Sequence, residues 1–109
     1  MRVHTVTNNY TDVSAAETEY WSQQTEHIWG YSIQFIWTAA GVDGTGKLQA
    51  SNDESNWDDI TGTSFAIGSG SNSKLFNCPD ICYKYVRSVI EITTGTIETL
   101  KVIMYQKGV

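Results

Sequence analysis

The sequence has little proline, cysteine and basic charge, and each shortage excludes a class of protein. One proline and two cysteines occur in 109 residues, so a small disulfide-stapled scaffold is not expected. Seven Lys and Arg residues against twelve Asp and Glu residues give a formal net charge of -5. Phosphate binding needs clustered Lys and Arg, so we expect no nucleic-acid partner. The same balance disfavours an anionic membrane surface.

Long apolar runs are also missing. No stretch approaches the roughly 20 apolar residues that a spanning helix needs, so we expect no membrane insertion. The first six residues, MRVHTV, carry one basic residue but no apolar core of a signal peptide. We therefore expect a protein that has no signal peptide and is made and used without export through the Sec pathway.

No residue set for catalysis stands out. The sequence has no Gly-x-Ser-x-Gly elbow or ordered triad signature. Asp58 and Asp59 are adjacent in a predicted strand, so their carboxylates point to opposite faces and do not serve one cleft. The acidic turn at Asp53 and Glu54 lacks the glycine and the closing glutamate of an EF-hand loop. We expect no enzyme, no cofactor and no calcium site.

The two cysteines leave two interpretations open. Cys78 and Cys82 flank the only proline in CPDIC and are close enough in sequence to form a local disulfide. Without export, reduced thiols are the expected state. A zinc site would need two more ligands, and His4 and His27 show no ligand spacing. We expect no metal, and we expect the cysteines to be dispensable for folding.

What the chain does have is the composition and periodicity of strands. Charged residues make up only 17%, and Thr, Ser, Asn, Gly and Tyr, which suit strands and turns, take their place. Apolar and polar residues alternate clearly over 31–38 and through the last third, where 93–96 predicts a hairpin turn. A flexible loop is predicted at 68–73. The predicted strands are 31–38, 47–51, 57–60, 65–67, 83–92 and 99–105.

These strands predict one all-β domain over 1–109. Seven or eight short strands with a turn signal every 8–12 residues are typical of an antiparallel β-sandwich, jelly-roll-like or galactose-binding-like. Residues 1–29 form a less regular N-terminal segment in this prediction. Within it, 18–21 favours a strand, and Ser14 to Glu17 match a capping box that could open one helical turn.

Large aromatic residues are abundant and divide into two groups. Trp37 and Trp57 are predicted to lie in the core. Trp21 and Trp29 fall in the poorly patterned segment and are expected to be partly exposed, which suits a protein interface or sugar stacking. The run 100–105 is apolar on both faces, as in a central strand or a strand against a neighbouring subunit. The candidate interaction residues are therefore Trp21, Trp29, Ile103 and Tyr105.

A combination of short motifs resembles a group of small tailed-bacteriophage proteins. These motifs are SIQ at 32–34, WT at 37–38, GKLQASND at 46–53, NWDDI at 56–60, YKYVR at 83–87 and TGT at 94–96. Members of this group are short β-sandwich proteins encoded among virion genes. The resemblance implies a non-enzymatic structural protein, such as a capsid decoration, head-fibre or tail-associated protein. It also implies a location in the virion after synthesis in the host cytoplasm, other virion proteins as partners, and homo-oligomers.

The same combination of motifs is also similar to that of discoidin and other galactose-binding-like domains. In both groups a glycine is usual in the first turn, at the position that Glu54 occupies here. This second resemblance implies an alternative function, a carbohydrate-binding or adhesion module of a larger assembly.

Overall fold

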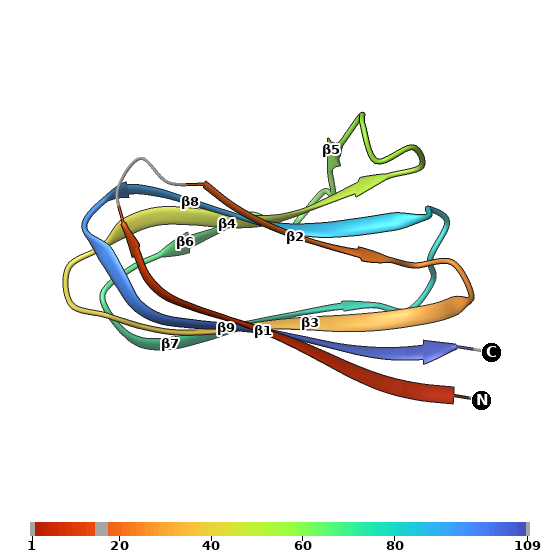
Figure 1. Ribbon diagram of the computed structural model, residues 1–109, viewed down its shortest axis with the longest axis horizontal. Helices are drawn as coiled ribbons and strands as arrows, with labels where there is room; N and C mark the ends of the chain where they lie inside the picture. The colour runs from red at the N-terminus through yellow and green to blue at the C-terminus, as the bar shows by residue number, and fades with distance from the viewer. Residues whose placement is uncertain (1, 15–17, 109) are drawn as a thin grey trace.

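Two antiparallel β-sheets pack face to face in the computed structural model, which describes residues 2–14 and 18–108 (Figure 1). We call the sheet with order β1-β9-β3-β7 sheet A. Sheet B has the order β2-β8-β4-β5, and β6 pairs with β4. The nine strands are β1 (Arg2–Ser14), β2 (Thr18–Gln24), β3 (Ile28–Ala39), β4 (Asp43–Ser51), β5 (Asp58–Asp59), β6 (Phe65–Ile67), β7 (Gly70–Cys78), β8 (Tyr85–Thr94) and β9 (Thr96–Gly108).

The antiparallel sandwich confirms the fold class that the sequence predicts. The described residues form nine strands rather than seven or eight. The extra strand comes mainly from 68–73, which the sequence predicts as a loop but which largely belongs to β7. Seven of the nine residues of β7 are exposed, so it has no alternation of apolar and polar residues to reveal it. Backbone pairing with β3 from Tyr31 to Ala39 makes it a strand.

The core lies between the sheets and follows the period-2 pattern of the central strands. In β3, Tyr31, Ile33, Phe35 and Trp37 all point inward and are buried, as predicted. Because successive residues of a strand alternate between faces, every second side chain of β8 and β9 meets them. These partners include Val86, Ile90, Ile92, Leu100, Val102 and Met104.

The turn at 93–96 joins the two sheets and is not a hairpin. β8 pairs with β2 and β4, whereas β9 pairs with β1 and β3. Gly95 has φ 82°, and a Cβ there would lie 1.9 Å from the carbonyl oxygen of Gly41. Only glycine fits this close crossing. The sequence shows the turn, but local patterning does not reveal that the chain changes sheet.

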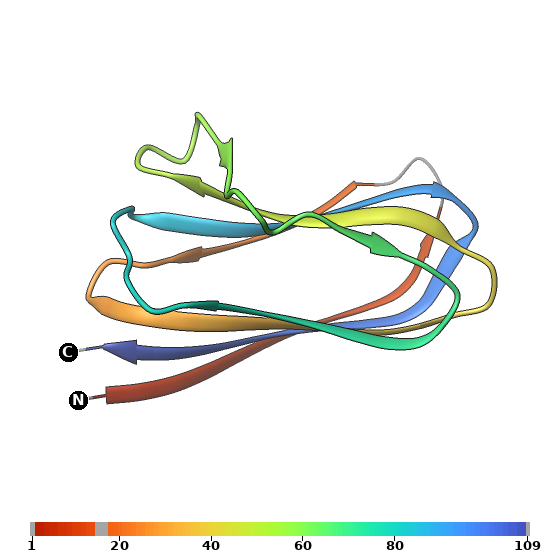
Figure 2. The same cartoon turned by 180° about the vertical axis from the view of Figure 1, so that it is seen from behind.

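The N-terminal part is more regular than the sequence predicts for 1–29. Residues 2–14 and 18–24 form two strands at neighbouring edges of the sandwich. Five of the thirteen residues of β1 are Thr or Asn, so its apolar signal is weak, but it pairs with β9 along almost its whole length. Of the predicted capping box, residues 15–17 lie outside the described residues. Figure 2 shows β6 and β7 on the opposite side of the sandwich.

The described chain contains no helix with the length and apolar character to cross a membrane.

Candidate interaction surfaces

The outer face of sheet A carries exposed apolar side chains on neighbouring strands. Ile36 of β3, Leu75 of β7 and Tyr105 of β9 are 38%, 57% and 41% exposed. Between them, Ile103 lies half-buried opposite Thr7 on one side and Gln34 on the other. β9 is therefore the central strand that its two apolar faces predicted. Of its two large outer side chains, Ile103 is half-buried and Tyr105 is exposed.

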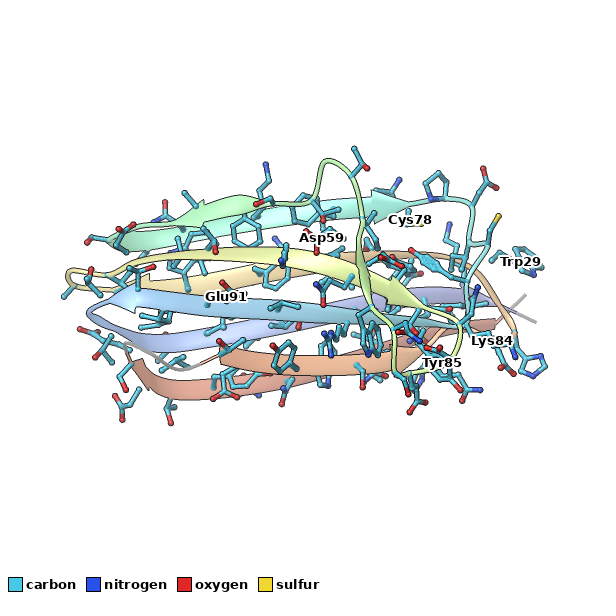
Figure 3. All side chains as sticks on the ribbon, turned by 90° about the horizontal axis from the view of Figure 1, so that it is seen from above. Trp29, Asp59, Cys78, Lys84, Tyr85 and Glu91 are labelled. Carbon is cyan, nitrogen blue, oxygen red and sulfur yellow. The ribbon has the colours of Figure 1, made fainter. Side chains whose placement is uncertain are left out.

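A shallow pocket opens at one end of this face and contains two of the predicted interaction residues. Trp29 lies at a break in the register between β3 and β9 and is 52% exposed. It projects from the end of the molecule where Cys78 also lies (Figure 3). The pocket has a volume of about 250 Å³, small beside typical ligand pockets of roughly 300–1,000 Å³. It is lined by Trp29, Gly30, Tyr31, Ser32, Asn77, Cys78, Pro79, Tyr105 and Lys107.

The glycine beside Trp29 makes the close packing at this pocket possible. A Cβ on Gly30 would lie 3.0 Å from the carbonyl oxygens of both Cys78 and Pro79. A side chain there would push the segment after β7 away from β3. The structure thus brings together Trp29 and Tyr105, with Ile103 farther along the same face.

Trp21 does not join this surface. It is opposite the buried Ser88 in the pairing of β2 with β8, so it points toward the interior. It is half-buried and packs against the core. Exposed Tyr20 and Ser22 on either side show the alternation of an edge strand. The sequence correctly expects partial exposure, but the face that Trp21 takes depends on its pairing partner.

The outer face of sheet B holds an arginine between two aromatic rings. The Arg87 guanidinium carbon lies 4.3 Å from the ring centroids of both Tyr20 and Trp57. Its Nε donates a hydrogen bond of 2.8 Å to Oε1 of Gln49. The prediction that Trp57 belongs to the core is therefore wrong, whereas Trp37 is buried as predicted. Trp57 directly follows the polar turn and covers the sheet from outside.

The polar row continues from Gln49 toward the sheet edge. Gln49 donates from Nε2 to Oδ1 of Asp59 at 2.8 Å, and Nζ of Lys47 lies 3.2 Å from the same carboxylate oxygen. These two partners, Gln49 first, hold the pKa of Asp59 below its ordinary value. Figure 3 looks onto this face, with Asp59, Tyr85 and Glu91 on it. Alternation in 83–91 predicts that Arg87 faces outward, but not which rings meet it.

The acidic turn is held by its own hydrogen bonds. The carboxylate of Asp53 accepts the backbone N–H groups of Ser55 and Asn56 at 2.9 and 2.8 Å, and it also accepts the Ser51 hydroxyl at 2.9 Å. The backbone N–H of Asn56 contributes most to a pKa of Asp53 far below its usual range. Glu54 has φ 63°, a backbone conformation that favours glycine. Asp53 thus serves the turn itself.

A second polar cluster closes the end of the sandwich. The hydroxyls of Tyr31 and Tyr83 are hydrogen-bonded to each other, and Sγ of Cys78 lies 3.6 Å from the Tyr83 hydroxyl. Burial raises the pKa of both phenols above 10. Cys78 is half-buried and Cys82 is exposed, and both are free thiols.

Neither cluster has the make-up of a metal site. Over 2–14 and 18–108, no three His, Cys, Asp or Glu side chains come together as a metal site would require. The hydrogen bonds of Arg87, Asp59 and Asp53 are made to partners within the same turn or sheet. Such groups stabilise the turn or sheet to which they belong.

Sequence comparison identifies no relative. No protein-family profile matches the chain, and no curated protein matches it.

Comparison of structures finds the same fold in several proteins. The PBSX exported protein XepA superposes with a TM-score of 0.69 at 12% identity, over 95% of this chain and 37% of XepA. A protein of the Bacillus endospore appendages, which are disulfide-linked pili, gives 0.62 at 10% identity, over 99% and 88%. The SPBc2 prophage-derived protein YomS gives 0.58 at 12%, over 96% of each chain.

A CBM4 structure also has this fold. It superposes with a TM-score of 0.52 at 16% identity, over 78% of this chain and 56% of the other. At these identities the likeness shows a shared β-sandwich fold. The neighbours thus include the phage-derived proteins that the sequence resemblance led us to expect.

Proposed function

We propose that this chain is a non-enzymatic structural protein of a bacteriophage virion, a capsid decoration or head or tail accessory protein. The observation that carries the proposal is the uncovered apolar surface on the outer face of sheet A. Ile36, Leu75 and Tyr105 are exposed there, and Trp29 is exposed at its end. Aromatic residues in such positions are typical of the centres of protein interfaces.

Two further points support this function. Phage-derived proteins are among those that share the fold. The hydrogen-bonded groups on sheet B are engaged with one another, so sheet A offers the better surface for another virion protein. In this proposal the chain is made in the host cytoplasm and reaches its place by assembly with virion proteins.

Sedimentation tests the proposal directly. The purified protein is mixed with capsid or tail proteins encoded in the same genome, and we expect it to cosediment with one of them. Leu75→Lys and Trp29→Ala are expected to weaken this binding at least tenfold, because they alter the exposed surface of sheet A. Tyr20→Ala is the matched control, since Tyr20 is 53% exposed on sheet B. A protein that binds none of the virion proteins contradicts the proposal.

A carbohydrate-binding module is the alternative, and the pocket around Trp29 favours it. An exposed indole ring stands there beside Ser32, Asn77 and Lys107, which offer hydrogen-bonding groups to a sugar. The CBM4 likeness adds only the fold. Titration with galactose, glucose and their oligosaccharides distinguishes the two functions. Saturable binding that Trp29→Ala abolishes, without binding to virion proteins, would establish the alternative.

A further inference from the structure

The edge of sheet A formed by β1 differs from the other edges of the two sheets. Exposed strand edges template pairing with other chains, and natural proteins protect them with short strands, lysine or proline. β5 and β6 have two and three residues, and β7 carries Lys74. β2 also lacks Lys and Pro, but it has only seven residues. β1 is thirteen residues long and has neither Lys nor Pro. In the described part of the chain it pairs with β9 only, so its second edge is open there.

Hydrogen-bond geometry restricts how two β1 strands can pair around a two-fold axis. In an antiparallel pair, two opposite residues both point their N–H and C=O groups toward the partner strand or both point them away. Residues of the same strand share that orientation only when they are an even number apart. The residue numbers of each opposite pair must therefore add up to an even number.

A backbone irregularity limits the regular length of β1. Asp12 has φ 53°, and the pairing with β9 skips it and continues in the same register from Thr11 to Val13. Regular edge is thus available from residue 2 to residue 11. Two registers meet the even-sum condition and pair nine residues of this regular edge. One is centred on Val6 and the other on Thr7.

The exposed side chains favour the register centred on Thr7. There Val3, which is 52% exposed, stands opposite Thr11 of the second copy, and Thr7 stands opposite its own copy. This gives three pairs of exposed β-branched residues. Centred on Val6, Val3 stands opposite Asn9, and the only such pairs are the two between Thr5 and Thr7. Nine paired residues make about eight to ten hydrogen bonds, which is near the number in a typical protein interface.

We propose that the chain forms a two-fold dimer by antiparallel pairing of β1 with β1 of a second copy, centred on Thr7. The two four-stranded A sheets then join into one continuous sheet. This inference specifies one contact within the proposed assembly function. It uses the strand edge and leaves the outer face of sheet A free for a different virion protein, so each fails or succeeds separately.

A charge-swap experiment at Thr7 tests the dimer. Light scattering after size exclusion is expected to give twice the monomer mass of 12.2 kDa. Thr7→Lys and Thr7→Glu each place two like charges opposite one another and are expected to raise the dimer dissociation constant about tenfold or more. An equal mixture of the two variants is expected to restore the dimer. The matched control is Thr99→Lys, which should remain dimeric. Thr99 is an exposed residue of β9 that lies opposite Thr11 and away from the open edge of β1.

Cross-linking tests the register. In a Cys78→Ser, Cys82→Ser background, Thr7→Cys is expected to form a covalent dimer on mild oxidation, because facing residues bring their Cβ atoms close enough. Asn9→Cys should not, since the partner of Asn9 is Thr5. A monomeric parent protein at high concentration, or cross-linking of both variants alike, overturns the proposal. Cosedimentation of the parent protein with virion proteins is scored separately and reports only on the proposed function.

Discussion

The guanidinium of Arg87 stacks on the ring of Trp57, with 4.3 Å between the guanidinium carbon and the ring centroid. Tyr20 lies at the same distance from it. This stack joins the end of the acidic turn to β8 and β2 on the outside of sheet B. Trp57 was predicted to lie in the core, but it packs against Arg87 on the outer face of sheet B.

Replacing the two central tryptophans should therefore have unequal effects. We expect Trp57→Ala to reduce the free energy of unfolding by about 1–2 kcal/mol, from the cation–π contact and partial burial. Trp37→Ala should cost about 3–5 kcal/mol, because it leaves a cavity in the core. Urea denaturation followed by circular dichroism measures both. Equal losses would show that Trp57 carries core packing.

At position 54 glycine should be more stable than alanine. Its φ of 63° strains any residue with a Cβ. Glycine relieves the strain, but it gives the unfolded chain more conformational entropy, which is lost on folding. We expect Glu54→Gly to be more stable than Glu54→Ala by about 1 kcal/mol. Both variants lack the glutamate side chain, so the difference in their urea midpoints isolates the backbone. A more stable alanine variant would contradict the left-handed turn.

Asp53 should make the stability of the turn depend on pH. The fold lowers the pKa of Asp53 well below its ordinary 3.8, so the charged form is favoured in the native state. The stabilisation is thus present above about pH 4 and is lost as the pH falls below that value. We expect Asp53→Ala to lower the melting temperature at pH 7 and to have a smaller effect near pH 2. An effect independent of pH would exclude the charge as its cause.

Neither cysteine should be needed for folding. Cys82 is exposed and Cys78 is half-buried, and both are free thiols. We expect Cys82→Ser to be neutral and Cys78→Ser to cost about 1 kcal/mol or less, since serine is able to keep a hydrogen bond near Tyr83. Melting curves with and without reductant check this. A double variant that is unfolded at room temperature would show a structural role for the pair.

The candidate site was only partly readable from the sequence. Trp29 stands out as a large aromatic residue in the poorly patterned segment 1–29, and Tyr105 as the last residue of a run that is apolar on both faces. Both line the pocket on sheet A. Their proximity depends on the pairing of β3 with β9, which places Ser32 opposite Tyr105. Arg87 was expected on an outer face. Its two ring partners come from 67 and 30 residues away in the sequence (87 − 20 and 87 − 57), which no local pattern encodes.

Alternation by itself determined the all-β class and the inward faces of β3, β8 and β9, because a strand sends every second side chain to the core. The tertiary structure decided which strands share a sheet, since backbone hydrogen bonds form equally well with any partner. For that reason β7 and β1 are strands despite weak patterns, and the turn at Gly95 crosses between sheets. The same freedom leaves the outer edge of β1 open to another chain.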